Sequence, residues 1–435
     1  MTGTQPSGGS HQTQLVVVER IAPGGSGVGR LPTGEVVFIQ GAAPGDEVEL
    51  SPISRRKGLA HATIHRLAKP GPERVAPSCP LASQCGGCDF MHLSRAGQRQ
   101  AKLDILGDAL RRVGGNPHGD VSIEFVASPM NLSYRSRVRL HVDKDGRVGF
   151  LSARSKQLVP IGQCQVSTPL INTALEALQQ VDGASRKLLT LCEQIELREA
   201  SVEPRLVVRL FARPKVNLDA RKFAPLFAQG SRVVVVGQPD DASVLQRYSL
   251  PGSVELRVPA SAFTQVNQHI NQEMVKAVLQ AAARHGVASF VDAYAGAGNF
   301  TLPLLAHGLT GEALDSHAAG IYCARGVARD QSWPHDGFQV GDARTLMESF
   351  ATAKRRFDLI LLDPPRDGAK NALDAALRLK PKLVILIACD PVALARDLQW
   401  LVTAGARVES LTLFDMFPQT HHFETLATVV LPNDR

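Results

Sequence analysis

Aromatic side chains are scarce in this chain, at 5% of its residues, so we do not expect a recognition surface built mainly on ring stacking. Long apolar runs are missing as well, because no segment approaches the roughly 18 apolar residues of a membrane span. The first residues, MTGTQPSGGSHQTQ, are polar and lack the apolar centre of a signal peptide. We therefore expect a cytoplasmic protein with no membrane partner.

Length and apolar content, in contrast, are ample. The 435 residues are enough for several domains, and a hydrophobic content of 44% supports ordinary cores throughout. A formal net charge of +7 permits a polyanionic partner without requiring one. In the cytosol the seven cysteines are better explained as metal ligands or nucleophiles than as disulfides.

Short apolar segments separated by glycines predict a small β-barrel over residues 14–72, after a disordered tail at residues 1–13. The basic cluster Arg55, Arg56 and Lys57 falls on a later loop of this barrel, where it forms either a solvated face or a nucleic-acid contact. The segments GGSGVGR and PGDEVE resemble those of a TRAM domain, a small RNA-binding barrel.

Three cysteines then lie close together in CPLASQCGGC, at Cys79, Cys85 and Cys88, and Cys164 follows after a long gap. A structural zinc site usually shows two C-x2-C pairs. Here there is one C-x2-C pair, one cysteine separated from that pair by five residues, and one distant cysteine, which favours an iron–sulfur cluster. We expect a [4Fe-4S] cluster, with zinc and uncoordinated thiols as the alternatives.

Short strands and turns alternate between residues 120 and 258, which predicts an α+β central domain that also includes residues 73–92. Arginines are frequent on these strands: Arg135, Arg137, Arg139, Arg147 and Arg154. The alternation of the first three places their guanidinium groups on one face of a sheet. That face is either solvated or a surface for an RNA backbone.

From residue 259 onward, apolar strand segments alternate with helical patterns. The predicted strands occupy residues 289–294, 311–315, 338–341, 358–363, 383–388, 408–415 and 425–431. Helices fit between the first six strands, whereas a short loop joins the last two, which therefore form an antiparallel hairpin. A doubly wound α/β sheet of seven strands with this final hairpin is the usual layout of an S-adenosylmethionine methyltransferase.

A glycine-rich turn, DAYAGAGN, follows the first of these strands, where a ligand can approach the backbone closely. Asp315 ends the second strand, where a carboxylate can bind ribose hydroxyls, and Asp342 ends the third, near the expected adenine. No third glycine stands at the dinucleotide spacing, and Asp363-Pro-Pro ends the fourth strand. Both features favour S-adenosylmethionine over a nicotinamide cofactor.

The stretch LVILIACDPVALARD predicts a buried strand, a corner at Cys389 and a helix that Asp390 caps. The helix amino end is expected to lower the pKa of the Cys389 thiol. A second carboxylate beside the thiol would raise that pKa unless Asp390 is engaged as the helix cap. By itself, such a cysteine is more often structural.

The final hairpin favours a catalytic role for Cys389 over a structural one. Because the last strand runs antiparallel, Glu424 at its start lies on the same edge as Cys389 and Asp363. A thiolate can add to carbon 6 of uracil, which makes carbon 5 nucleophilic, and a base must later remove the carbon 5 proton. We expect Cys389 to be the nucleophile and Glu424 the base, with Asp363 and Gln265 at the polar edges of the site.

The whole set of motifs resembles the bacterial RNA uracil-C5 methyltransferases, especially the 23S ribosomal RNA type with a TRAM domain and an iron–sulfur cluster. The motifs are CPLASQCGGC with Cys164, FTQVN, YAGAGNFTLP, LLDPPRDGA, ACDPVALARD and DMFPQTHHFE. The resemblance covers nearly the whole chain and implies that residues 93–119 pack on a catalytic domain at 259–435. It also implies cluster ligation by the four cysteines and cofactor contacts at Gln265, Tyr294, Asn299, Asp315, Asp342 and Asp363.

An RNA partner is therefore expected, with ribosomal RNA favoured and no obligate protein partner, so that the protein is a monomer. A transfer RNA uridine-C5 methyltransferase is one alternative. A catalytically silent RNA-binding relative is the other, because the family usually has Asn where this chain has Asp390. An RNA cytosine-C5 enzyme would carry Pro-Cys on the fourth strand, which DPPRDG lacks.

Overall fold

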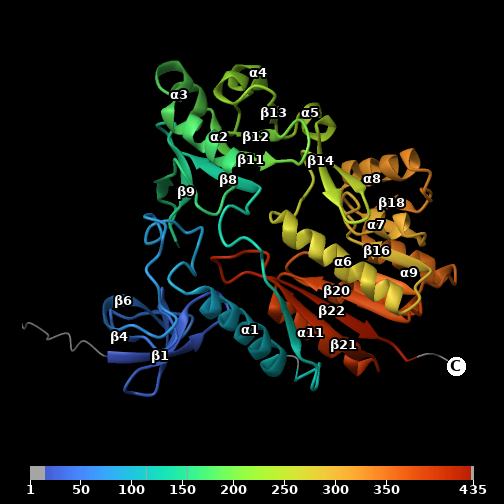
Figure 1. Cartoon of the computed structure of the whole chain (residues 1–435), viewed down its shortest axis with the longest axis horizontal. Helices are drawn as coiled ribbons and strands as arrows, with labels where there is room; N and C mark the ends of the chain where they lie inside the picture. Colours follow the sequence, from blue (N-terminus) through green and yellow to red (C-terminus); the bar gives the residue numbers. More distant parts are fainter. Residues whose placement is uncertain (1–14, 114, 154, 433–435) are drawn as a thin grey trace, which may run out of the picture. The chain divides into compact units, whose positions relative to one another are not determined.

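The computed structural model describes residues 15–113, 115–153 and 155–432 (Figure 1). The predicted disordered tail and Arg154 lie outside the described residues. Contacts divide the chain into two compact units. The amino-terminal unit contains the described residues up to Ala82 with Cys88–Ile105 and Gln419–His421, and the larger unit contains Ser83–Gly87, Leu106–Pro418 and the described residues from His422 onward. The finer domain boundaries given above stay predictions.

A small β-barrel forms the first part of the amino-terminal unit, as the sequence predicts. Its strand order is β3-β2-β1-β4-β6-β5, and an additional pairing of β3 with β6 closes it. Alternate apolar residues such as Val16, Val18 and Ile39 are buried inside it. The strands are β1 Leu15–Ile21, β2 Gly27–Arg30, β3 Val36–Gln40, β4 Glu47–Leu50, β5 Ser54–Arg56 and β6 Leu59–Lys69. The helix α1, Arg95–Arg112, begins in this unit.

A mixed sheet with the order β10-β9-β8-β11-β12-β13 forms the central part of the larger unit. Helix α2 packs against β11. The strands are β8 Arg137–Val142, β9 Val148–Leu151, β10 Leu158–Pro160, β11 Cys192–Glu199, β12 Leu206–Ala212 and β13 Arg232–Val235. The helices are α2 Pro169–Gln180, α3 Gly183–Leu189, α4 Ala220–Phe223, η1 Ala224–Leu226 and α5 Pro239–Ser243.

The second sheet of the larger unit has eight strands within the described residues, in the order β18-β17-β16-β19-β20-β22-β21-β7. The strands are β16 Ser289–Ala293, β17 Thr310–Asp315, β18 Phe338–Val340, β19 Leu359–Leu362, β20 Leu383–Ala388, β21 Arg407–Phe414, β22 Glu424–Val430 and β7 Ile123–Val126. The prediction of seven strands is therefore wrong by one. The eighth strand, β7, pairs in parallel with β21 and covers what would otherwise be an open sheet edge.

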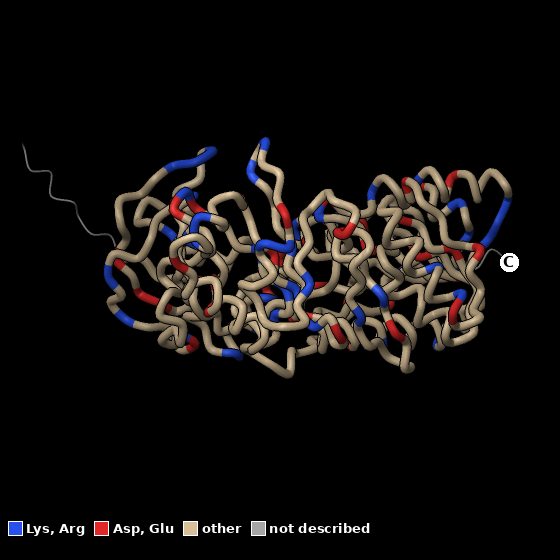
Figure 2. The backbone as a smooth tube through the Cα atoms, turned by 90° about the horizontal axis from the view of Figure 1, so that it is seen from above, with Lys and Arg blue, Asp and Glu red and all other residues tan. Residues whose placement is uncertain are grey.

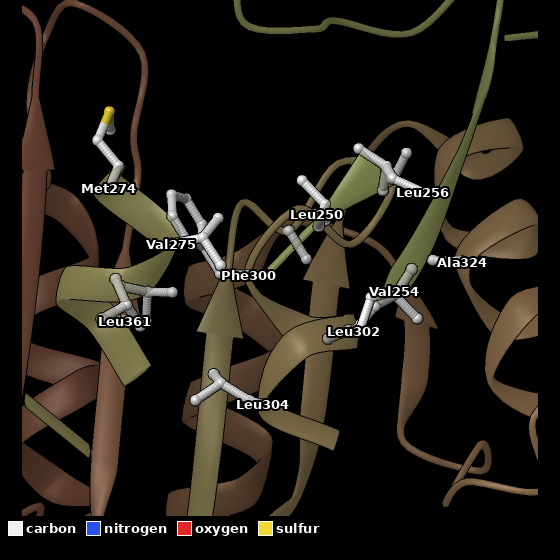
Figure 3. Packing of buried hydrophobic residues seen from close by; sticks show 14 of the residues in the cluster. Leu250, Val254, Leu256, Met274, Val275, Phe300, Leu302, Leu304, Ala324 and Leu361 are labelled. Carbon is white, nitrogen blue, oxygen red and sulfur yellow. The ribbon is translucent and has the colours of Figure 1, made fainter. Parts of the chain in front are cut away.

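Helices lie on both faces of this sheet (Figure 1). They are α6 Gln268–Arg284, α7 Thr301–Ala306, α8 Ala318–Asp330, α9 Ala343–Thr352, α10 Lys370–Arg378 and α11 Pro391–Thr403. On one face, Met274 and Val275 of α6 join Phe300, Leu302 and Leu361 in an apolar core (Figure 3). The hairpin of β14 Leu245–Leu250 and β15 Val254–Pro259 completes that core. In the described part of the chain, no helix is both long and apolar enough to cross a membrane.

Candidate active site

Strand pairing brings Cys389, Glu424 and Asp363 to one edge of the sheet. Ala388, the last residue of β20, pairs with Thr425 of β22, so Cys389 follows β20 opposite Glu424, the first residue of β22. Asp363 directly follows β19, which runs parallel to β20. The carboxyl edge of such a sheet is where open α/β folds bind ligands.

The Cys389 thiol is less acidic than the sequence predicts. Burial is the main cause that raises its pKa, to about 11, and the charges of Glu424 and Asp363 act in the same direction. The prediction that the helix amino end lowers this pKa is wrong. The reason is that burial and the two carboxylates outweigh the influences that lower this pKa. Asp390 is engaged as the cap of α11, accepting hydrogen bonds from the N–H groups of Val392 and Ala393 at 2.9 and 2.8 Å.

Arg366 provides positive charge at this edge. Its guanidinium opposes the raised pKa of Cys389 and of Glu424. Glu424 is 7% exposed, and burial, followed by the charge of Asp363, holds the pKa of its carboxyl well above the usual range. The sequence reasoning did not select Arg366, although an arginine directly after a strand that ends in Asp363-Pro-Pro is a usable signal.

The glycine turn after β16 leaves room for a ligand. The Gly296 N–H donates to Oδ2 of Asp315 at 2.8 Å, and the His317 N–H donates to Oδ1 at 2.7 Å, so Asp315 fixes the turn and the start of α8. A Cβ on Gly296, whose φ is +57°, would meet no described atom within 4 Å. Gly298 is different, since its Cβ would lie 2.9 Å from Leu302. One glycine therefore keeps space open and the other permits close packing.

Four of the six predicted cofactor contacts, Tyr294, Asp315, Asp342 and Asp363, lie at the carboxyl ends of the neighbouring strands β16 to β19. Asp342 also caps α9, because its Oδ1 accepts from the N–H and the hydroxyl of Thr345, both at 2.9 Å.

The other two predicted contacts, Gln265 and Asn299, come from outside the strand ends. The amide of Asn299 pairs reciprocally with that of Asn271 on α6 at 2.8 and 2.9 Å. Gln265 is buried in the segment before α6.

A further buried carboxyl, Asp292, was not selected from the sequence. Burial raises its pKa to about 7, and burial likewise raises the pKa of Asp363 to about 7. The Thr301 hydroxyl donates to Oδ2 of Asp292 at 2.5 Å, whereas Oδ1 has no hydrogen-bond partner among the described residues.

The arginines of β8 are engaged within the protein. Arg139 pairs with the buried Glu196 at 2.8 Å. Arg137 lies over the ring of Phe263, with 4.7 Å between the guanidinium carbon and the ring centroid. Phe263 itself is 64% exposed. Basic and acidic residues are both scattered along the backbone (Figure 2). An arginine over an exposed ring is a more specific RNA-contact candidate than the row of charges that the sequence predicts.

All seven cysteines lie among the described residues, and none forms a disulfide. Of the four predicted cluster ligands, Cys79 and Cys88 belong to the amino-terminal unit, and Cys85 and Cys164 to the larger unit. Each is partly exposed. The described residues contain no group of three or more His, Cys, Asp or Glu placed to hold a metal ion.

A glycine turn with open space beside Asp315, at the carboxyl edge of an open α/β sheet, is the kind of place where such folds bind a nucleoside-containing ligand. A family model described as tRNA (Uracil-5-)-methyltransferase matches residues 345–432, and a TRAM domain model matches residues 11–50. The chain belongs to the RNA (uracil-C5)-methyltransferase family, because relatives that carry this name are 32% identical to it over more than nine tenths of its length.

Relatives match almost the full length. The chain is 32% identical to the 23S rRNA (uracil(1939)-C(5))-methyltransferase of Aeromonas hydrophila, over 92% of this chain and 92% of that protein. For the protein of the same name from Pseudomonas entomophila, the identity is 32% over 97% and 96%. The fold is also that of a Pyrococcus abyssi tRNA (uracil-54, C5)-methyltransferase solved with S-adenosyl-L-homocysteine, with a TM-score of 0.74, 24% identity, and 97% and 100% coverage.

Proposed function

We propose that this protein methylates carbon 5 of a uridine in 23S ribosomal RNA, at the position equivalent to the uracil 1939 that its relatives' names give. The observation that carries the proposal is the placement of Cys389 opposite Glu424, at the sheet edge that holds the glycine turn. The 32% identity to the two bacterial relatives over nearly the whole chain supports the choice of ribosomal RNA.

In the proposed mechanism, the Cys389 sulfur forms a bond to carbon 6 of the uracil, and the electrons of the ring double bond move to carbon 5 and its neighbouring carbonyl. Arg366 favours the thiolate in this step, because its charge opposes the raised pKa of Cys389. S-adenosylmethionine, when bound, would supply the electrophilic methyl group: carbon 5 would bond to this methyl as its bond to the sulfonium sulfur breaks, and the electrons of that bond would stay on the sulfur of S-adenosylhomocysteine. Glu424 then removes the carbon 5 proton, the ring double bond re-forms, and the carbon–sulfur bond breaks to release Cys389.

Six residues are proposed to hold the methyl donor: Gln265, Tyr294, Asn299, Asp315, Asp342 and Asp363. The open space at Gly296 and the position of Asp315 beside it fit the ribose of the methyl donor and the methionine portion attached to that ribose. Phe263 and Arg137 are proposed to contact the RNA, because the ring is exposed and already carries a cation on one face.

The mechanism is tested with an RNA fragment that contains the target uridine. Cys389→Ala is expected to abolish methyl transfer while RNA binding survives. Cys323→Ala is the matched control, because burial raises the pKa of that thiol to about 11 as well, but Cys323 lies on α8. Full turnover by Cys389→Ala would exclude Cys389 as the nucleophile and would indicate that methyl transfer proceeds without a covalent adduct.

The base is tested by Glu424→Gln. This variant should accumulate a covalent protein–RNA adduct on a denaturing gel, since addition and methylation proceed but release is blocked. The adduct should be missing from a Cys389→Ala/Glu424→Gln double variant. If Glu424→Gln turns over normally and shows no slow-migrating band, another group removes the proton.

Transfer RNA is the second candidate substrate, because the matching family model and the Pyrococcus abyssi protein are both described as tRNA methyltransferases. Mapping 5-methyluridine in ribosomal and transfer RNA, from cells with and without the gene, separates the two. Loss of the modification from transfer RNA alone would overturn the ribosomal assignment.

We also propose that Cys79, Cys85, Cys88 and Cys164 hold a [4Fe-4S] cluster. Four partly exposed cysteines outside any disulfide provide the thiolate ligands that such a cluster needs. The methylation consumes no electrons, so the cluster would stabilise the fold or position RNA. Protein purified without oxygen should contain about four irons per chain, and Cys88→Ser should lose them. Stoichiometric zinc without iron would exclude the cluster.

A cytoplasmic, monomeric enzyme is proposed as well. Cell fractionation and light scattering of the purified protein test these two points.

A further inference from the structure

The loop at residues 415–423 joins β21 to β22 and ends directly before Glu424. Its middle residues, Gln419–His421, belong to the amino-terminal unit, although their neighbours in the chain belong to the larger one. We propose that contacts within the amino-terminal unit hold this loop so as to position Glu424, and that a turn of the barrel is part of them. The proposal rests on the proposed function, in which Glu424 is the base.

Asp89, the residue after Cys88, makes the first of these contacts. The backbone N–H of His421 donates to Oδ1 of Asp89 at 2.9 Å, and Nδ1 of His421 pairs with Oδ2. The next residue, Phe90, donates its N–H to the carbonyl of Gln419 at 2.9 Å. The ring of Phe90 also meets that of His421 edge-on, with 6.3 Å between centroids. One short segment thus holds the loop at two residues.

Gln98 of α1 makes the second contact. Its Oε1 accepts the backbone N–H of Gln419 at 2.9 Å, and its Nε2 donates to the Gln419 side chain at 3.1 Å. Gln98 is 5% exposed, so these bonds are sheltered from water. They hold Gln419 at a φ of +69°, a left-handed conformation that costs a residue with a side chain roughly 1–2 kcal/mol. Such strain persists only where the surroundings fix it, and it is concentrated at functional sites.

The third contact comes from the barrel turn between β1 and β2. Gly25 has a φ of +79°, and a Cβ there would lie 2.6 Å from Oδ2 of Asp89 and 3.1 Å from Nδ1 of His421. Only glycine fits this position. Its neighbour Gly24 has a φ of +90°, but a Cβ there would meet no described atom within 4 Å.

The segment that carries Asp89 is itself anchored on the barrel. His92 pairs through Nε2 with the carbonyl of Ala42 at 3.2 Å, and its own carbonyl accepts the N–H of Val75 at 2.9 Å. Gly25, Asp89 and Gln98 therefore lie around Gln419 and His421, and we call these three residues the loop clasp.

Within the larger unit, the same loop is fixed just before the clasp. The Tyr134 hydroxyl donates to the Pro418 carbonyl at 2.9 Å, and the Asn267 amide donates to the Met416 carbonyl at 3.4 Å. Only two residues separate His421 from Glu424. A shift at the clasp is therefore passed directly to the base, and a misplacement of about 1 Å can cost roughly 100-fold in rate. The barrel would then act in catalysis as well as in RNA contact.

The test compares Gly25→Ala with Gly24→Ala. Both variants carry the strain of a side chain at positive φ, but only Gly25→Ala crowds Asp89 and His421. Gly25→Ala should lower kcat by about 10- to 100-fold, leave the KM for RNA unchanged and accumulate the covalent RNA adduct, because release needs Glu424. Gly24→Ala should behave as the unmodified protein. Equal behaviour of the two variants, or a lower kcat without adduct, overturns the proposal.

Asp89→Ala tests the same contact with His421 without changing a residue of the barrel. It should also accumulate the adduct, whereas Asp89→Asn, which keeps an acceptor for the His421 N–H, should recover part of the turnover. The Gly25→Ala/Asp89→Ala double variant should be little slower than Asp89→Ala alone, since the carboxylate that a Cβ would crowd most closely is gone and the His421 ring is no longer held by it. Additive losses in the double variant would count against a shared contact.

Glu424→Gln, run on the same gel, distinguishes failure of the loop clasp from failure of the proposed mechanism. An adduct with Glu424→Gln but none with Gly25→Ala or Asp89→Ala overturns the loop clasp and leaves the mechanism standing. No adduct with Glu424→Gln overturns the proposed mechanism itself.

Discussion

Replacing Asp292 by asparagine should make the larger unit more stable at alkaline pH than at acid pH, relative to the unmodified protein. The Asp292 carboxyl is fully buried, and burial raises its pKa from 3.8 to about 7. Its Oδ1 has no partner among the described residues. Ionising this group in the folded state is therefore unfavourable, and asparagine of nearly the same shape never ionises.

The size of the effect follows from proton linkage. Between about pH 5 and pH 7, Asp292 is protonated in the folded chain but ionised in the unfolded chain, so folding takes up one proton. The stability that protonation provides is complete below pH 3.8 and is lost as the pH rises to about 7. At about 1.4 kcal/mol per pH unit, less near the folded pKa where the group is half ionised, the unmodified protein loses roughly 2 kcal/mol relative to Asp292→Asn between pH 5 and pH 7.

Hydrogen exchange of the β16 and β19 amides measures the free energy of opening of the sheet that carries Asp292. Both proteins are compared at pH 5, 6, 7 and 8, so that intrinsic exchange rates cancel. The stability difference should grow up to about pH 7 and then level off. A difference that is the same at pH 5 and pH 8 would show that Asp292 is ionised in the folded protein throughout and would refute the reasoning.

Two further predictions concern the thiol. Arg366→Gln removes the charge that opposes the raised pKa of Cys389, so the rising limb of the rate–pH profile should move to higher pH. The rate at neutral pH should then fall about tenfold for each pH unit that the limb moves. An unmoved limb would exclude Arg366 from thiol activation. Asp390→Ala should cost about 1 kcal/mol of stability through the lost cap, whereas Asp390→Asn, an equally good cap, should match the unmodified protein in thermal unfolding and in its rate–pH profile.

The strands of the second sheet could be predicted because their signals are local. Residues 383–388 are an unbroken apolar run that ends at a cysteine and a capped helix, and β20 occupies those residues. The short link between the last two strands requires an antiparallel hairpin, and this register brings Glu424 opposite Cys389. Sequence reasoning therefore placed residues on the sheet edge wherever one local pattern determined the position.

Features that depend on distant partners could not be predicted in this way. Strand β7 has only four residues, and its partner β21 lies almost 300 positions further along the chain. Arg139 is exposed as the sequence predicts, but its ion pair with the buried Glu196 depends on the pairing of β8 with β11, which no local pattern shows. The contact of Gly25 with Asp89 and His421 joins three segments that no local pattern connects.

The thiol shows how tertiary burial can outweigh a local signal. The helix amino end beside Cys389 could be predicted from the sequence, but the burial of the sulfur and the charges of Glu424 and Asp363 come from distant segments. Cys389 is left with a pKa of about 11, among carboxyl groups that resist its ionisation. Such a thiol is a poor target for oxidation, because the thiolate is the reactive form. In the proposed mechanism, the reactivity of Cys389 would come from the bound uracil and from the charge of Arg366.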